Sequence, residues 1–282
     1  MAKKQNVDQE EMSFLDHLEE LRWHLIRATL AIVIVGVVAF IFKDFIFDDI
    51  IFAPARPDFI SYDFLCRMAT IFGSDKGCVN EMNFIIQNRT MGGQFNAAIW
   101  TSIIVGVVVA FPYVIYEFWK FISPGLYEKE RKNSRGFIII SSLLFFLGVL
   151  FGYYVIAPLS INFLANFTVG DQVKNEFDIG SYIGLVRSSA LAAGLIFELP
   201  IIMYFFTKIG LVTPEFLRKY RKYALIIVLV ISAVITPPDI STQVIVSIPI
   251  LILYEASILI SAFVVRQEAR QLKRTQKAKN KN

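Results

Sequence analysis

The chain has 282 residues, of which 55% are hydrophobic and 14% aromatic, with a mean hydropathy of +0.56. These values exclude an ordinary soluble globular protein and predict a polytopic membrane protein. The formal net charge of +4 does not indicate nucleic-acid binding, because the basic residues form short clusters beside apolar runs, where they set membrane topology.

The chain opens with a polar tail, residues 1–12, that lacks a cleavable signal. The next segment, SFLDHLEELRWHLIRA, has apolar residues at helical spacing and polar residues on the opposite face. We expect an amphipathic lead-in at the inner interface that continues into a spanning helix over residues 25–42. The only histidines, His17 and His24, are about 10 Å apart along this helix and too far to share a metal ion, so we predict no metal site and interpret both as interface residues.

Six apolar spans are predicted, at residues 25–42, 97–119, 137–157, 182–206, 223–236 and 243–265. The expected fold is therefore all-α, with a six-helix membrane domain over residues 13–265. The fifth span has only about 14 apolar residues, or roughly 21 Å of helix against a hydrocarbon core near 30 Å. This length predicts local thinning of the bilayer.

The distribution of Lys and Arg predicts the orientation. Clusters at residues 3–27, 120–135, 208–222 and 266–282 share one face, whereas the opposite loops hold few basic residues. The positive-inside rule then places both termini in the cytoplasm. The basic tail, residues 266–282, is interpreted as a solvated stop-transfer segment, with contact to anionic lipid as the alternative.

The cytoplasmic loop SPGLYEKER, residues 123–131, is a short polar turn between two long apolar helices. Glu128 and Glu130 follow the turn residues Pro124 and Gly125, so their carboxylates are held at a fixed height below the membrane. Such carboxylates suit recognition of a cationic peptide. The alternative is an ordinary connector of mixed charge.

Glu198, in the sequence GLIFELP, is predicted to lie near the middle of the fourth span. A charge at this depth costs on the order of 3 kcal/mol, so the side chain should face a cavity, a partner or another polar group, or be protonated. Arg187 lies eleven residues earlier and on the same helical face, and we expect the two to line one polar groove without pairing directly. A purely structural buried acid is the alternative, and Glu255 in the sixth span is a weaker second case.

Four motifs occur in order along residues 14–265: FLDHLEELRWHL, FISPGLYEKER, FELP and TPPD. Together they resemble the TatC family, the polytopic component of the twin-arginine protein translocase. The resemblance implies a receptor in the bacterial cytoplasmic (inner) membrane, without a cofactor and not an enzyme. Its implied partners are twin-arginine signal peptides of folded cargo and the single-span proteins TatA and TatB, within an oligomeric complex surrounded by membrane lipid.

The resemblance also implies roles for individual residues. Glu20 and Glu130 match the two carboxylates that bind the paired arginines, and the positions around them are Arg22, Phe121 and Pro124. Glu198 matches the intramembrane acid that faces partner helices, and Asp239 matches the acid of the outer turn after TPP. Guanidinium is a planar fork that meets a carboxylate with two parallel hydrogen bonds, which a lysine cannot do.

Two other functions were weighed. A secondary transporter would explain an intramembrane carboxylate, but the two halves lack a matching pair of Gly/Pro-broken spans. An intramembrane hydrolase needs a nucleophile and a base within the spans, whereas both histidines are expected at the inner interface.

The outer loop, residues 48–96, departs from the family pattern because it is long and holds both cysteines, Cys66 and Cys78. A loop of this length must carry local structure or a partner. Because the predicted topology puts it in the oxidising compartment, we expect a disulfide between them, worth roughly 3 kcal/mol for a ring of about a dozen residues. Two free buried thiols are the alternative.

Overall fold

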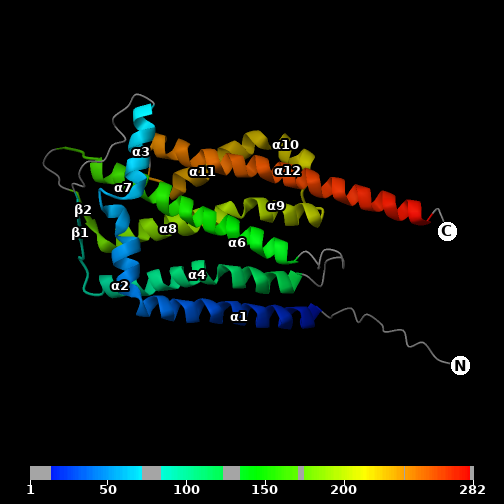
Figure 1. Ribbon diagram of the computed structural model, residues 1–282, viewed down its shortest axis with the longest axis horizontal. Coiled ribbons are helices and arrows are strands. Elements are labelled where there is room, and N and C mark those ends of the chain that lie inside the picture. Colours follow the sequence, from blue (N-terminus) through cyan, green and yellow to red (C-terminus); the bar gives the residue numbers. More distant parts are fainter. Residues whose placement is uncertain (1–13, 72–83, 123–133, 171–174, 238, 280–282) are drawn as a thin grey trace.

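The computed structural model describes residues 14–71, 84–122, 134–170, 175–237 and 239–279. Long helices lie side by side along its longest axis (Figure 1). Within this part of the chain, five helical segments are long and apolar enough to cross a membrane: Glu19–Ile41, Gly93–Ile122, Gly136–Asn166, Ile179–Lys208 and Thr242–Gln267. The prediction of a polytopic helical membrane protein is confirmed.

Helices α1 (Phe14–Ile41) and α4 (Gly93–Ile122) are far apart in the sequence but pack along each other. Glycines permit the close approach, because a Cβ added to Gly106 would lie 2.6 Å from the Ile32 carbonyl oxygen and 3.1 Å from the Gly36 Cα. Small residues at such crossings allow the dispersion contacts that hold membrane helices together.

The third apolar segment comprises α6 (Ser134–Phe151), a π-helical turn η5 (Gly152–Ile156) and α7 (Ala157–Asn166). Pro158, at the start of α7, lacks the N–H that would continue the hydrogen bonds of the preceding turn. A π-helical turn at this point accommodates the missing backbone hydrogen bond. Helix α6 packs against the next helix, α8 (Ile179–Phe197).

The fourth span, predicted over residues 182–206, is confirmed as the apolar segment Ile179–Lys208, but this segment consists of two helices. Helix α8 ends before Glu198, and α9 (Leu199–Lys208) begins after it. Pro200 lies in the first turn of α9 and cannot donate a backbone hydrogen bond. Glu198 N–H instead donates to the Leu195 carbonyl at 3.2 Å, so the two helices meet at the carboxylate.

The last segments are α10 (Pro214–Lys219), α11 (Arg221–Ile235) and α12 (Ile240–Lys279). The 15 residues of α11 span about 22 Å, so this helix is as short as predicted and falls outside the five segments above. The sixth predicted span, residues 243–265, agrees with the apolar segment Thr242–Gln267, but α12 does not end with that segment. It continues through most of the basic tail to Lys279.

The predicted outer loop carries local structure, as expected. Helix α2 (Lys43–Phe45) precedes this loop, which contains most of η1 (Ile46–Ile51), η2 (Ala53–Ala55), α3 (Ile60–Ile71) and the strand β1 (Ile85–Gln87). Strand β1 pairs in parallel with β2 (Glu176–Asp178), so the chain is mostly helical but not all-α. These elements gather at the end of the bundle away from the start of α1 and the end of α12 (Figure 1).

Three tyrosines fasten this outer segment. Tyr182 and Tyr153 donate hydrogen bonds to the carbonyls of Ile51 and Ile50, at 2.9 and 2.6 Å. Tyr62 in α3 donates to the Pro54 carbonyl at 2.7 Å, and burial raises the pKa of its phenol. Each bond satisfies a carbonyl left free where the regular helices are interrupted.

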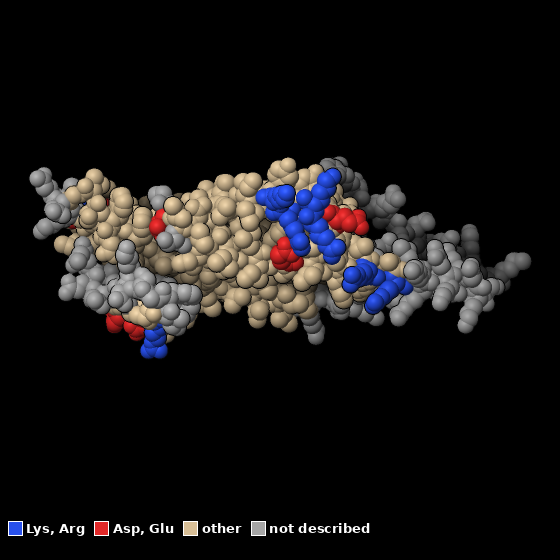
Figure 2. Space-filling view, turned by 90° about the horizontal axis from the view of Figure 1, so that it is seen from above, with Lys and Arg blue, Asp and Glu red and all other residues tan. Residues whose placement is uncertain are grey.

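Charged residues are concentrated at the two ends of the molecule. Figure 2 shows Lys and Arg gathered towards the end where α1 begins, separated from the few charges at the other end by a broad uncharged surface. The exposed basic residues of α10 and α11 include Arg218, Lys219, Arg221 and Lys222. Between the ends, exposed side chains such as Leu30 and Val37 give α1 an apolar outer face, which suits contact with lipid.

Candidate functional site

The first turns of α1 and the last turns of α4 lie at the same end of the bundle (Figure 1) and bring two acids and a histidine together. His24 Nδ1 lies 2.5 Å from Glu117 Oε2, across 93 residues of sequence. His24 Nε2 lies 4.0 Å from Oε1 of Glu20, one helical turn earlier on α1. The imidazole therefore lies between two carboxylates.

The second carboxylate oxygen of Glu20 is the unusual atom of this cluster. Although 37% of the Glu20 side chain is exposed, its Oε2 is buried and has no hydrogen-bond partner among the described residues. A buried carboxylate oxygen without a donor carries a desolvation cost that a bound cation or N–H donor removes. This atom points to a cationic ligand.

Aromatic side chains surround the histidine. The ring of Phe121, in the last turn of α4, meets His24 edge-on with 6.5 Å between the ring centroids. The Tyr113 side chain, one turn before Glu117, interacts with the same carboxylate. Glu117 is only 2% exposed, so the His24–Glu117 pair lies in surroundings that strengthen its electrostatic interaction.

The predicted receptor residues are partly brought together by this arrangement. Glu20 and Phe121 both lie next to His24. Arg22 is exposed on α1. Glu130 and Pro124 lie outside the described residues.

Neither Glu117 nor a partner for His24 was predicted from the sequence. A signal for Glu117 was present, because it is the only acid in the long, mostly apolar helix α4. The four-residue spacing of Glu20 and His24 was a second signal, since it puts both on one helical face. His24, which was expected to be an interface residue, therefore also contacts two acids.

Glu198 is 7% exposed and accepts a hydrogen bond of 2.7 Å from the Ser141 hydroxyl of α6. Its other oxygen, Oε1, is buried without a hydrogen-bond partner in the described part of the chain. The acid therefore has a polar neighbour, as its depth required. That neighbour is Ser141. Arg187, which was predicted to line the same groove as Glu198, is partly buried on α8.

The two remaining acids have structural roles. Asp239 Oδ2 accepts hydrogen bonds from the Thr242 N–H and hydroxyl, both at 2.7 Å, which caps the start of α12. Glu255 was a weaker case for a buried charge, and this is wrong: its side chain is 52% exposed and pairs with Arg221 at 2.7 Å.

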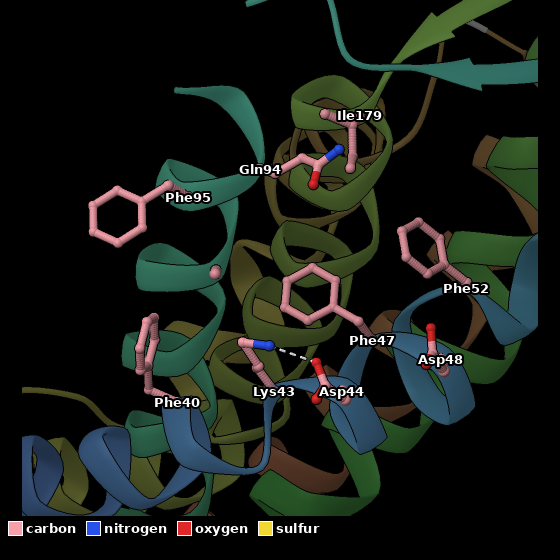
Figure 3. A pocket seen from close by; sticks show the side chains of 10 residues that line it. Phe40, Lys43, Asp44, Phe47, Asp48, Phe52, Gln94, Phe95 and Ile179 are labelled. Carbon is pink, nitrogen blue, oxygen red and sulfur yellow. Dashed lines mark hydrogen bonds and ion pairs between the residues drawn. The ribbon is translucent and has the colours of Figure 1, made fainter. Parts of the chain in front are cut away.

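A pocket of about 390 Å³ lies at the opposite end of the bundle, between α1, η1, α4 and α8 (Figure 3). Phenylalanine rings line it, and Lys43 and Asp44 form an ion pair of 2.6 Å at its side. This pocket is separate from the Glu20–His24–Glu117 cluster. Among the described residues, no group of three or more His, Cys, Asp or Glu is placed to hold a metal ion.

Cys66 of α3 is disulfide-bonded. Cys78 lies outside the described residues. The pairing of the two therefore stays a prediction.

A bundle of apolar helices with basic residues at one end, and with buried carboxylates where α4 meets α1 and where α8 meets α6, defines a polytopic membrane protein. The sequence profile of TatC, the Sec-independent protein translocase protein, matches residues 16–249. The chain belongs to the TatC family.

Individual relatives agree along the whole chain. The TatC protein of Blattabacterium sp. subsp. Periplaneta americana is 44% identical over 263 residues, covering 93% of this chain and 99% of the relative. The TatC protein of Aquifex aeolicus is 34% identical over 258 residues, covering 91% and 98%. The crystal structure of the twin-arginine translocase receptor TatC in DDM superposes with a TM-score of 0.67 at 33% identity, covering 87% of this chain and 99% of that one.

Family membership confirms the resemblance found in the motifs. A TatC protein is a component of a protein translocase and not an enzyme, and it is a multi-pass protein of the bacterial inner membrane. A secondary transporter receives no support from any of these relatives.

Proposed function

We propose that this chain is the signal-peptide receptor of a twin-arginine translocase, in which Glu20 and Glu130 bind the paired arginines of cargo signal peptides. The observation that carries the proposal is the Oε2 of Glu20, which is buried and has no hydrogen-bond partner among the described residues. A guanidinium group supplies two parallel N–H donors and a positive charge to such a carboxylate. Lysine supplies a point charge, so the proposal also accounts for a preference for arginine.

The receptor site must face the cytoplasm, where signal peptides are made. We place both termini there, with six spans, because the basic residues of α10 and α11 lie at the end of the bundle where α1 begins (Figure 2). Helix α11 supplies the sixth span despite its 15 residues, since the bilayer can thin around a short helix.

The single-span proteins TatA and TatB are the proposed membrane partners, and Glu198 is the proposed contact. Its Oε1 is buried without a hydrogen-bond partner among the described residues, so a polar side chain from a partner helix would complete its hydrogen bonding. Arg187 is proposed to line the same groove, eleven residues earlier. The basic tail, residues 266–282, is proposed to be a solvated stop-transfer segment, with contact to anionic lipid as the alternative, and the complex is proposed to be oligomeric.

The receptor site is tested with an arginine-paired signal peptide that carries a photo-crosslinker, added to membranes containing the full chain. Glu20→Gln and Glu130→Gln should each weaken crosslinking, and replacing both acids with Lys should abolish it while membrane insertion is retained. The loss reaches about 2–3 kcal/mol, because an unpaired arginine in a partly buried site keeps its desolvation cost.

Glu255→Gln is the matched control, because it removes a carboxylate from an exposed ion pair on α11 and α12. Crosslinking should be unchanged in this variant. Crosslinking that survives in the double-Lys variant would sink the receptor assignment.

A further inference from the structure

The pocket between α1, η1, α4 and α8 lies where the apolar surface of the bundle meets its polar end. Phe40 is in the last turn of the apolar segment Glu19–Ile41, and Phe95 is in the first turn of α4. Lys43 and Asp48 also line the pocket, but they follow the end of that apolar segment. One part of the pocket therefore lies at the depth of lipid acyl chains and the other at the depth of lipid headgroups.

Aromatic contacts fix the inner wall of the pocket. Phe52 stacks on Tyr182 with 5.9 Å between the ring centroids, and Phe47 packs against Phe52 at 6.0 Å. The Tyr182 hydroxyl is bonded to the Ile51 carbonyl, so the stack cannot move without breaking a buried hydrogen bond. The cavity of about 390 Å³ is thus formed without a ligand, which lowers the cost of filling it.

The opposite side of the pocket faces the membrane. Figure 3 shows Phe40 and Phe95 together on this side, away from Phe52 and Asp48. Phe95 is 65% exposed, which at this depth means contact with lipid. A chain held against the inner wall can therefore leave between Phe40 and Phe95 into the hydrocarbon. This shape suits an amphiphile, with its head among the polar residues and its chain between the rings.

The charged residues of the lining restrict the headgroup. Lys43 Nζ donates a hydrogen bond of 2.6 Å to Asp44 Oδ1. Asp48 accepts from Arg56 at its backbone carbonyl, 2.8 Å away, but its carboxylate has no donor within the described part of the chain. One lysine and two aspartates give the lining a net negative charge. A purely anionic head would meet two carboxylates, whereas a head that carries a cation beside its phosphate complements both signs.

The cation that fits best is a primary ammonium group. Such a group donates up to three hydrogen bonds to a carboxylate, as a lysine does, whereas a trimethylated choline group donates none. Choline is bound by aromatic cages, preferably of Trp or Tyr, and the rings of this pocket are phenylalanines. Lys43 has three donors, so it can keep its bond to Asp44 and also reach a phosphate oxygen.

We propose that this pocket binds a phospholipid with an ethanolamine headgroup. Its ammonium group contacts Asp48, its phosphate contacts Lys43, and its acyl chain passes between Phe40 and Phe95. The site lies at the opposite end of the bundle from Glu20, so the inference does not depend on the receptor assignment. Signal-peptide crosslinking tests that assignment separately.

The test uses the purified full chain in nanodiscs with trace amounts of photoreactive phospholipids. Three analogues carry ethanolamine, choline or glycerol heads and the same photoreactive group in the acyl chain, close to the glycerol backbone. Mass spectrometry then maps the labelled peptides. The ethanolamine analogue should label the peptides that contain Phe40 or Phe95 about 3-fold more than the choline analogue does, and the glycerol analogue should label them least.

Asp48→Asn is the main variant, because the side chain is exposed and its carboxylate holds no other described residue in place. Labelling by the ethanolamine analogue should fall to the level of the choline analogue. Asp49→Asn is the matched control, since this neighbour is exposed, carries the same charge and does not line the pocket. It should keep the full preference for ethanolamine.

Lys43→Gln tests the phosphate contact. All three analogues should label the pocket less, because each loses the same partner, while the preference for ethanolamine over choline is retained. Excess water-soluble phosphoethanolamine should not reduce labelling, since it lacks the chain that fills the apolar part of the pocket. Displacement by this compound would mean that the site takes a free headgroup and would overturn the lipid assignment.

Other outcomes also overturn the inference. Equal labelling of the pocket by the ethanolamine and choline analogues would remove the role of Asp48, and stronger labelling by choline would mean that the rings act as a cage. Labels confined to other peptides would show that no lipid occupies the pocket. If Lys43→Gln does not accumulate in membranes, the comparison of Asp48→Asn with Asp49→Asn decides alone.

Discussion

The Ser141 hydroxyl and the Glu198 carboxylate form a hydrogen bond of 2.7 Å between α6 and the junction of α8 and α9. One donor satisfies one oxygen, and Oε1 stays buried without a partner in the described part of the chain. Helix α8 ends before Glu198, and Pro200 in the first turn of α9 prevents the two helices from forming one continuous helix. Glu198 therefore lies at a break in the span. Within the described part of the chain, one carboxylate oxygen of Glu198 thus has a hydrogen-bond donor and the other has none.

The first prediction concerns this acid. Glu198→Ala should spare signal-peptide binding but reduce recruitment of the single-span partners, since a polar side chain of the partner would then meet only apolar surface. Co-purification of a TatA- or TatB-type protein with the tagged chain measures the loss. Ser141→Ala should not reduce recruitment, because it keeps the Glu198 carboxylate and leaves its second oxygen available to the partner as well.

Ser257→Ala is the matched control, since the Ser257 hydroxyl donates only within its own helix, to the Leu253 carbonyl at 2.7 Å. Recruitment should be unchanged. Cysteine crosslinks from position 198 that reach lipid and no partner would contradict the assignment.

The membrane helices could be predicted from the sequence because a long apolar run has few alternatives to a spanning helix. The junction at Glu198 was also visible in principle, as Pro200 stands two residues later. The continuation of α12 to Lys279 could not be predicted, because the composition of a polar segment does not show whether it continues a helix or forms a loop. Strands β1 and β2 have three residues each, too few to show an alternating pattern.

The His24–Glu117 contact could not be predicted for a different reason. It joins residues 93 positions apart, and the sequence does not specify which faces of α1 and α4 meet. That choice depends on Gly36 and Gly106, which allow the helices to approach along one line. Motif matching recovered Glu20 and Phe121 but not the buried acid that connects them through the histidine.

The second prediction concerns the outer segment and its cysteines. We expect Cys66 to pair with Cys78, because these are the only two cysteines in the chain and Cys66 is disulfide-bonded. In unreduced membranes neither thiol should react with a maleimide, and both should react after reduction. Replacing both with Ser should cost roughly 3 kcal/mol of stability in the outer segment. Full alkylation without reductant would refute the pairing.

The third prediction concerns the glycines at the helix crossings. Gly106→Ala should destabilise the α1–α4 contact by about 1–3 kcal/mol, because its Cβ would lie 2.6 Å from the Ile32 carbonyl and the helices would have to separate. Gly152→Ala should act similarly on the contact between η5 and α8, where the added carbon would clash with the Ser189 carbonyl. Thermal unfolding in detergent measures both.

Gly184 provides the comparison for these variants. It lies in α8, but an added Cβ meets nothing within 4 Å. Gly184→Ala should be neutral or slightly stabilising, since Ala favours the helix over Gly. Equal melting temperatures for all three variants would mean that close helix approach does not limit the stability of the bundle.

The last prediction concerns the tyrosine that fastens the outer segment to α8. Tyr182 is 4% exposed, donates to the Ile51 carbonyl at 2.9 Å and stacks on Phe52 with 5.9 Å between ring centroids. Tyr182→Phe keeps the stacking but leaves the carbonyl without its donor, at a cost of about 1–3 kcal/mol. Because η1 and η2 have little regular hydrogen bonding of their own, limited proteolysis should cut the outer segment several-fold faster. Tyr223→Phe, at a position that is 62% exposed, should leave the cleavage rate unchanged. Equal cleavage of the Tyr182 variant and the unmodified chain would show that stacking alone holds the segment.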